Sequence, residues 1–399
     1  MVAPKLRFKE FDGDWTSKQL GKIIGISSAS RVFKEQWQDS GVPFFRTSDV
    51  VSIFKNKENE KAYISLELFE ELAKKSGKIK QGDLLVTGGG SIGIPYLVPN
   101  DQPLYFKDAD LLWMKSSGIV EGSFLYNFFI SPKFREYLKS ISHTGTISHF
   151  TIEQAKATPF GFPSKEEQTK IASFLSNVDE KISQLTQKHQ LLSQYKQGMM
   201  QKLFSQQIRF KADDGSEFGE WEEKTLGSLG VFKSGQGFPE KYQGGKTGVP
   251  FFKVSDMNTY GNEKRMVVAN NYVDADSILE MKVKVILDES IIFAKVGAAV
   301  FLERKRLATN FLIDNNMMAF TPDPKLNINF IKQFLDTIKF SNFVQVGALP
   351  SYNAGDLAII PIHIPCVVEQ TKIANFLSAI DQKIDMVAQQ IEQTKQWKK

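Results

Sequence analysis

The sequence contains one cysteine, Cys366, and no long run of apolar residues. A lone cysteine excludes a disulfide within the chain, as expected for a protein of a reducing compartment. The longest apolar runs fall short of the roughly 20 residues that a membrane-spanning helix needs. The first residues, MVAPKLRFKEFDGDW, include no apolar signal core. These absences predict a cytoplasmic protein without a membrane segment.

Motifs that would carry catalysis are equally scarce. No Asn-Pro-Pro occurs, which argues against the flipped-base pocket of an adenine methyltransferase. Residues 88–93, GGGSIG, lack the lysine and hydroxyl of a phosphate loop and predict a structural turn. Asp288, Glu303 and Lys305 have the order of a metal-dependent nuclease site, but such triples arise often by chance. The four histidines lack metal-ligand spacing. We therefore expect no catalytic residue, no metal and no cofactor.

The overall composition is that of a globular protein with a modest basic excess. A length of 399 residues predicts two or three domains, and 42% hydrophobic residues suffice for a core in each. The net charge of +5 permits a polyanionic partner without demanding one.

A 17-residue stretch occurs twice, and the two copies share most of their positions. It reads EQTKIASFLSNVDEKIS at residues 167–183 and EQTKIANFLSAIDQKID at residues 369–385, an offset of 202 residues. The repeat extends further, because GVPFFRTSD at residues 41–49 recurs as GVPFFKVSD at residues 248–256. Each half also enters with a tryptophan followed by KQLG or KTLG. Two half-chains of similar architecture are predicted.

The repeated stretch begins a long amphipathic helix in each half. Apolar residues recur at alternating spacings of three and four, which predicts two helices that pair along their length. Ser164 and Glu167 form a capping box that starts the first helix. Cys366 stands in the place of Ser164, so the start of the second helix follows from Pro365 and the repeat. About 40 residues at 1.5 Å each give a rod of roughly 60 Å.

The segments between these landmarks read as α+β globular domains. Residues 83–93 and 290–300 predict strands that enter glycine turns. Helical windows interrupt the strands at residues 66–75, 124–140 and 328–343. The expected division is a first domain at 1–163, a first helix at 164–208, a second domain at 209–365 and a second helix at 366–399. Residues 56–80 and 260–287 diverge almost completely between the halves, the pattern of two readers with different specificities on one frame.

These motifs resemble those of the specificity subunits of type I restriction-modification systems. The resemblance rests on the proline-led EQTKIA helix starts, the paired GVPFF and tryptophan motifs, and QYKQGMMQKLF at residues 194–204. It implies two target recognition domains, each reading one half of a bipartite site in double-stranded DNA. It also implies long helices that form an antiparallel coiled coil, set the spacing and carry two methyltransferase subunits, with restriction and translocase subunits joining the complex. The counterpart of residues 198–204 is missing after the second helix, which is expected to be shortened.

The resemblance makes polar residues on the strands and loops of each half candidates for DNA contact. The candidates of the first half are Arg31, Lys34, Arg46, Ser48, Ser91, Thr146 and His149. Those of the second half are Lys241, Tyr242, Lys246, Lys253, Ser255, Lys295, Ser351 and Tyr352. The candidates for holding methyltransferase subunits lie outside the helical seam and are Gln168, Lys170, Phe174, Gln370, Lys372 and Phe376. For the two phenylalanines, packing against the adjacent domain is the alternative.

Three classes of function compete. The leading hypothesis is a DNA-reading scaffold without catalytic sites of its own, whose enzymatic partners modify and cleave DNA. A self-sufficient DNA enzyme would need an unrecognised motif, and a bivalent scaffold for proteins would show no sequence-dependent DNA affinity. The phenylalanine pairs of the two GVPFF motifs could stack on single-stranded bases, but their strand-like setting favours core packing.

Overall fold

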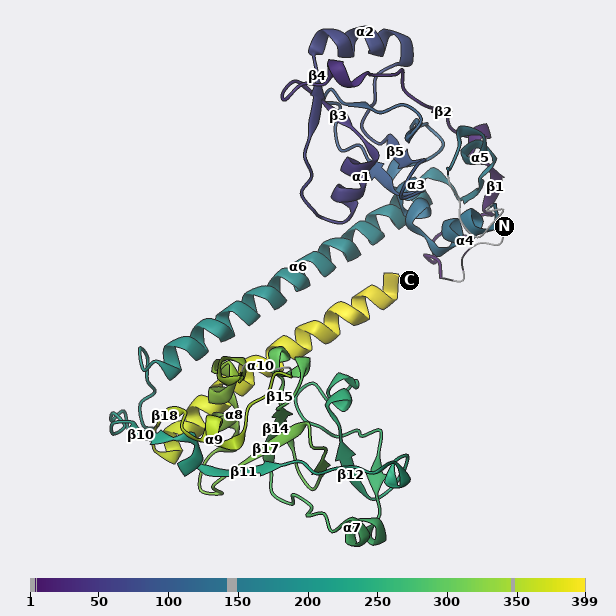
Figure 1. Cartoon of the computed structure of the whole chain (residues 1–399). Coiled ribbons are helices and arrows are strands. Elements are labelled where there is room, and N and C mark those ends of the chain that lie inside the picture. The colour runs from purple at the N-terminus through teal and green to yellow at the C-terminus, as the bar shows by residue number, and fades with distance from the viewer. Residues whose placement is uncertain (1–3, 5, 142–148, 346–348, 399) are drawn as a thin grey trace. The chain divides into compact units, whose positions relative to one another are not determined.

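The computed structural model describes residues 4, 6–141, 149–345 and 349–398. They form two compact units, residues 1–182 with Lys398 and residues 183–397, and Figure 1 labels many of their elements. The division falls inside the first long helix, α6 (Lys165–Phe204). Each unit combines small sheets with helices, so the prediction of an α+β fold is confirmed.

The described residues of the first unit form three small sheets. A four-stranded sheet has the order β2-β8-β5-β6, a three-stranded sheet has the order β4-β3-β7, and β1 pairs with β9. Its strands are β1 (Thr16–Gln19), β2 (Ile26–Ser27), β3 (Val42–Phe45), β4 (Ala62–Ile64), β5 (Leu84–Thr87), β6 (Pro95–Leu97), β7 (Tyr105–Phe106), β8 (Leu111–Met114) and β9 (Pro159–Phe162). Its shorter helices are η1 (Leu20–Lys22), η2 (Lys34–Gln36), α1 (Thr47–Phe54), α2 (Leu66–Ser76), α3 (Gly122–Ile130), α4 (Pro132–Ser140) and α5 (Ile152–Ala157).

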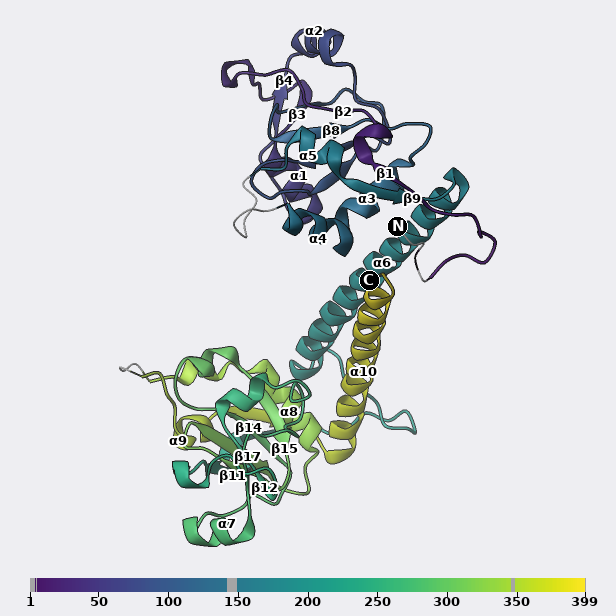
Figure 2. The same cartoon turned by 90° about the vertical axis from the view of Figure 1, so that its right-hand side faces the viewer.

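The second unit repeats this plan. Its sheets have the orders β11-β17-β14-β15, β13-β12-β16 and β10-β18, and Figure 2 shows β11, β17 and β14 side by side. Its strands are β10 (Glu222–Thr225), β11 (Gly230–Ser234), β12 (Val249–Phe252), β13 (Tyr272–Val273), β14 (Ser290–Ala294), β15 (Lys305–Ala308), β16 (Leu312–Ile313), β17 (Met317–Pro322) and β18 (Pro361–Ile364). Its helices are η3 (Leu226–Ser228), η4 (Glu240–Tyr242), η5 (Val254–Asn258), α7 (Ala275–Met281), η6 (Ala298–Leu302), α8 (Ile328–Thr337), η7 (Phe340–Phe343), α9 (Ala354–Ala358) and α10 (Val367–Lys398).

Each strand of the first unit has a counterpart in the second. The GVPFF motifs form the central strands β3 and β12, which pair antiparallel with β4 or β13 and parallel with β7 or β16. Phe44, Phe251 and Phe252 are buried in these strands, so core packing rather than base stacking explains them. The internal repeat is therefore a repeat of fold as well as of sequence.

Both long helices begin two residues after a proline, as the repeat predicted. Ser164 accepts a hydrogen bond from the backbone of Glu167 at 3.3 Å, which supplies one half of the expected capping box. The reciprocal half is not formed, because the carboxylate of Glu167 binds the guanidinium of Arg7 instead. This part of the cap prediction was wrong, since nothing near Glu167 in the sequence marks a partner 160 residues away.

Within the second unit, the last part of α6 packs antiparallel against α10. Leu185 of α6 is buried with Val387 and Ile391 of α10. Further along α6, Lys196 donates two hydrogen bonds of 2.7 Å to Asp381. The partner number falls as the α6 number rises, which is the signature of antiparallel packing. The predicted seam positions are thus the positions at which the helices meet.

Two of the predicted helical windows are interrupted in the structure. The window at residues 124–140 is divided into α3 and α4, because Ser131 caps α4 and Pro132 occupies its first turn. The window at 328–343 ends as a regular helix at Thr337 and continues as the short η7. Ser131 followed by proline is a helix-start signal that a purely apolar pattern overlooks.

Candidate nucleic-acid interface

Several candidate residues of the first unit lie around the turn after β5. Gly90 and Gly93 adopt positive φ values of 68° and 71°, which the turn requires and glycine supplies at little cost. His149 forms a bridge with Gly89, so the segment before α5 lies against the turn that carries Ser91. The expected structural turn is confirmed, and it brings Ser91 and His149 together. Thr146 lies outside the described residues.

The corner between β3 and α1 lies against the same turn. A Cβ placed on Gly90 would be 3.8 Å from the side-chain methyl of Thr47. On either side of Thr47, the Arg46 guanidinium donates to Asp49 at 2.9 Å and the Ser48 hydroxyl accepts from an amide at 3.2 Å. The corner therefore places Arg46 and Ser48 beside the glycine turn, with the arginine already neutralised by a carboxylate.

Sequence reasoning missed two carboxylates at this place. Asp108 and Asp110 lie in the turn between β7 and β8, where Asp108 pairs with Arg31 at 3.2 Å. A Cβ on Gly89 would be 3.2 Å from an oxygen of Asp110, which also pairs with Lys107 at 2.7 Å. Carboxylates accept hydrogen bonds from the exocyclic amino groups of bases. The only sequence signal was a polar run directly after a buried strand.

The candidate Lys34 lies outside this turn, on η2, and is exposed.

The second unit brings together three of its candidates in the same way. Lys295 directly follows β14, and the next residue, Val296, forms a bridge with Ser351. Lys295, Ser351 and Tyr352 line one small pocket. The hydroxyl of Tyr352 is buried and donates to the carbonyl oxygen of Ala294 at 2.5 Å, and burial raises its pKa. Lys295 and Ser351 are therefore the members of this group that can reach a ligand.

The remaining candidates of the second unit divide between two places. Lys253 and Ser255 occupy the β12–η5 corner, the counterpart of the Arg46 corner, where the Lys253 ammonium donates to a glutamine side chain at 2.7 Å. Lys241 pairs with Glu280 of α7 at 2.6 Å, and this contact raises the pKa of Lys241 to about 12. Tyr242 and Lys246 belong to the same β11–β12 connection.

Two of the six partner candidates have roles inside the chain. Gln168 is fully buried, accepts from the backbone of Glu121 at 2.9 Å and donates to the carbonyl oxygen of Pro163 at 3.0 Å. Gln370 repeats this with Asn327 and Pro365. Through these hydrogen bonds the two glutamines fasten each helix to its own domain. Because their side chains are buried, they cannot contact an external partner.

The other four partner candidates pack against the segment that precedes each tryptophan. The Phe174 ring lies 5.8 Å from Phe8 and Phe376 lies 5.5 Å from Phe210, so the packing alternative applies to both. Phe174 nevertheless stays 45% exposed. Lys170 forms an ion pair with Glu10, and Lys372 forms one with Asp213. Phe174 is the strongest remaining candidate for an external partner.

The nuclease-like triple is not assembled. Phe293 of β14 is paired with Lys305, whereas Asp288 precedes the opposite end of β14. Lys305 is buried, and its ammonium bonds to Glu303 and to the carbonyl oxygen of Ile338 at 3.0 Å each. Among the described residues no group of three or more His, Cys, Asp or Glu could hold a metal ion. In that same part of the chain, no helix is long and apolar enough to cross a membrane.

The family model of the type I restriction modification DNA specificity domain matches residues 12–194 and again residues 219–396. The chain belongs to this family. The two matches follow the two structural repeats, so this specificity subunit carries a DNA specificity domain in each half.

Curated relatives extend the likeness of the specificity subunit along the chain. The putative type I restriction enzyme MjaX specificity subunit of Methanocaldococcus jannaschii is 26% identical, with 99% of this chain and 93% of the relative covered. The MjaIX specificity subunit of the same organism is 26% identical, with 78% and 76% covered. A putative Haemophilus influenzae specificity subunit is 28% identical over 171 residues, 41% of its length.

Solved structures show the same fold at low identity. The S subunit of a type I restriction-modification system from M. genitalium aligns with a TM-score of 0.56 at 17% identity, covering 100% of this chain and 97% of the other. The HsdS subunit from Thermoanaerobacter tengcongensis aligns with a TM-score of 0.51 at 16% identity, covering 100% and 96%. The arrangement of elements in this specificity subunit is therefore shared with both.

Proposed function

We propose that each half of this specificity subunit binds one half of a bipartite target in duplex DNA. The observation that carries the proposal is the repeated site. In both units the end of a central strand (β5 or β14) meets the segment before a short helix (α5 or α9), and in the first unit the β3–α1 corner joins them. The side chains at these places differ between the units. The first unit carries Arg46, His149 and Asp110, whereas the second carries Lys253, Ser351 and Lys295. A shared frame with unlike side chains suits the reading of two different sequences.

The proposal assigns catalysis to partner subunits. Two methyltransferase subunits would dock along the long helices, and restriction and translocase subunits would join through the complex. The recognition domains are proposed to be residues 1–163 and 209–365, with residues 164–208 and 366–399 as the connecting helices. The lone cysteine supports a cytoplasmic setting. The specificity subunit then contributes selection of the site and spacing of its halves, with no cofactor of its own.

Mapping of methylated adenines tests this function directly. The full chain is assembled with its methyltransferase subunit and exposed to genomic DNA, and the methylated positions are sequenced. The expected result is one motif made of two short sequences separated by a spacer of fixed length without sequence preference. A continuous motif, or methylation independent of sequence, would contradict the proposal.

The salt dependence of DNA affinity should change when the partners join. Several candidate cations of this chain are already paired with its own carboxylates, as in Arg31 with Asp108, Arg46 with Asp49 and Lys241 with Glu280. Because the slope of log affinity against log salt counts neutralised phosphates, the isolated chain should show a shallow slope. Adding the methyltransferase subunits should steepen it. Equal slopes, measured by titration at several salt concentrations, would show that this chain makes the phosphate contacts by itself.

A further inference from the structure

Each long helix begins with a buried glutamate that is held from two sides. The Glu167 carboxylate accepts two hydrogen bonds of 2.7 Å from the guanidinium of Arg7 and a longer one, 3.4 Å, from the indole of Trp15. Glu167 is only 1% exposed. A bidentate arginine fixes the direction as well as the distance of its carboxylate. The segment before β1 is thereby fastened to the first turn of α6.

The second helix has the same three-residue clamp. Arg209 donates to Glu369 at 3.1 and 2.8 Å, and the indole of Trp221 donates to it at 3.1 Å. All three residues stand at nearly the same offset as in the first half. The glutamine that follows each glutamate is bonded to the domain as well. The Glu-Gln pair at each helix start therefore attaches the helix to its domain, and we call this attachment the joint.

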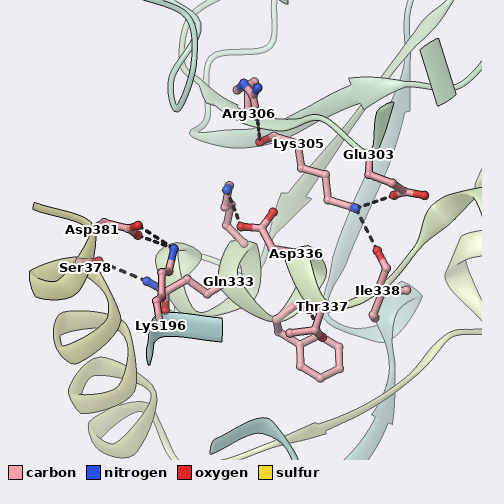
Figure 3. Close-up of polar contacts among 12 residues, drawn as sticks. Lys196, Glu303, Lys305, Arg306, Gln333, Asp336, Thr337, Ile338, Ser378 and Asp381 are labelled. Atoms are coloured by element: carbon pink, nitrogen blue, oxygen red, sulfur yellow. Dashed lines mark hydrogen bonds and ion pairs between the residues drawn. The ribbon is translucent and has the colours of Figure 1, made fainter. Parts of the chain in front are cut away.

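The second joint has additional attachments. Four apolar residues of α10, Ile373, Ala374, Leu377 and Ile380, belong to the main core of the second unit. The Gln333 amide of α8 also donates to the Ala374 carbonyl oxygen and to the Ser378 hydroxyl of α10, both at 3.2 Å. Figure 3 shows Gln333 reaching Ser378, with Lys196 and Asp381 beside them. The helix is thus part of the domain core.

Among the described residues, fewer contacts join the first domain to its helix. From α6, the corresponding core takes Ala172, with Ile171 partly buried at its edge. The place of Gln333 is taken by Asn127 of α3, whose shorter side chain donates to the Ser123 carbonyl oxygen of its own helix at 2.8 Å. A side chain that bonds within its own helix does not tie that helix to α6. The attachment of the first domain to α6 therefore depends more on the clamp formed by Arg7, Glu167 and Trp15.

We propose that Arg7, Glu167 and Trp15 are positioning residues that fix the angle of the first recognition domain on its helix, and thereby the accepted spacer length. The second domain keeps its angle through its core even without the arginine clamp. This inference rests on the proposed function. A spacer changed by one base pair moves a half-site by roughly 3.4 Å and turns it by about 35°. A domain held rigidly on its helix cannot follow such a shift, whereas one with a loosened joint can.

The test compares Arg7→Ala with Arg209→Ala in the full chain assembled with its methyltransferase subunit. The substrates are duplexes that carry both mapped half-sequences separated by spacers of different lengths. For Arg7→Ala we expect methylation of spacers one base pair longer or shorter to rise about tenfold relative to the best spacer, roughly the loss of one modest interaction. Arg209→Ala should keep the original spacer. Lys9→Ala, an exposed change in the same segment as Arg7, is the matched control.

Each outcome decides between the alternatives. If both arginine variants widened the range of methylated spacer lengths equally, or if neither did, the proposal that the two joints differ would be overturned. A changed half-sequence in Arg7→Ala would instead count against modular reading, which is the proposed function itself. If Arg7→Ala does not fold, as judged by its thermal melting, Arg7→Lys keeps the charge but loses the bidentate geometry. The Arg7→Lys variant should then methylate a slightly wider range of spacer lengths, with unchanged half-sequences. If its range of spacer lengths stays the same, the proposal is also overturned.

Discussion

Exchanging residues 23–150 for the equivalent segment of another family member is expected to change one half of the methylated sequence completely and leave the other half untouched. The exchanged segment includes the corner, the glycine turn and the β7–β8 turn of the first unit. It leaves Arg7, Trp15 and the β1–β9 pairing in the host chain, so the joint with α6 is retained. Each unit has separate buried cores, which makes the exchange tolerable.

Methylated-site sequencing of the hybrid complex measures this result. The reciprocal control exchanges residues 230–352, which should alter the opposite half only. If either hybrid changed both half-sequences, the two domains would be reading the site jointly. A hybrid that kept the original motif would place base recognition outside the exchanged segments.

The long helices should act as a ruler for the spacer between the half-sites. Four residues added to α6 after Gln194, together with four added to α10 after Lys383, preserve the contacts on both sides of the insertion. Lys196 still faces Asp381 on one side, and Leu185 still faces Val387 on the other. The pair becomes longer by about 6 Å at 1.5 Å per residue. We expect the same two half-sequences with a spacer longer by about one or two base pairs.

The insertion in α6 alone is the informative control. It slides the Leu185 contact by four residues against α10 while keeping the Lys196 contact, so the pairing is broken on one side. This variant should lose stability, seen as a lower melting temperature, and should lose activity without a clean change of spacer. A stable double insertion that methylates the original spacer would show that the helices do not set the distance.

The sequence predicted the architecture well because the architecture is carried by local periodicity and by the repeat. The three-and-four spacing identified residues such as Leu185 and Val387, which do meet. It could not reveal tertiary partners. Glu167 looked like a local cap because its true partner, Arg7, lies 160 residues away. Gln168 and Gln370 looked like surface residues of the helices because nothing in a helical pattern shows that a neighbouring domain covers them.

The candidate DNA site was predictable in part for the same reason. Strand ends followed by glycine turns can be read locally, and they led to Ser91 and Lys295. Asp108 and Asp110 were missed because their relevance depends on the β7–β8 turn lying against the β5 turn, a contact between segments about 20 residues apart. The polar hydroxyl of Tyr352 makes it a candidate in the sequence, but the fold buries this hydroxyl against the Ala294 carbonyl oxygen.

Cys366, which replaces the capping serine at the start of α10, is the single cysteine of the chain and is exposed. It therefore offers one thiol for a fluorescent or spin label, one residue before the helix begins and next to the Gln370 joint. A second cysteine introduced at Ser164 would create a labelled pair at equivalent points of the two repeats. Distances between such labels, recorded with and without DNA, would report directly on how the two halves move during target search.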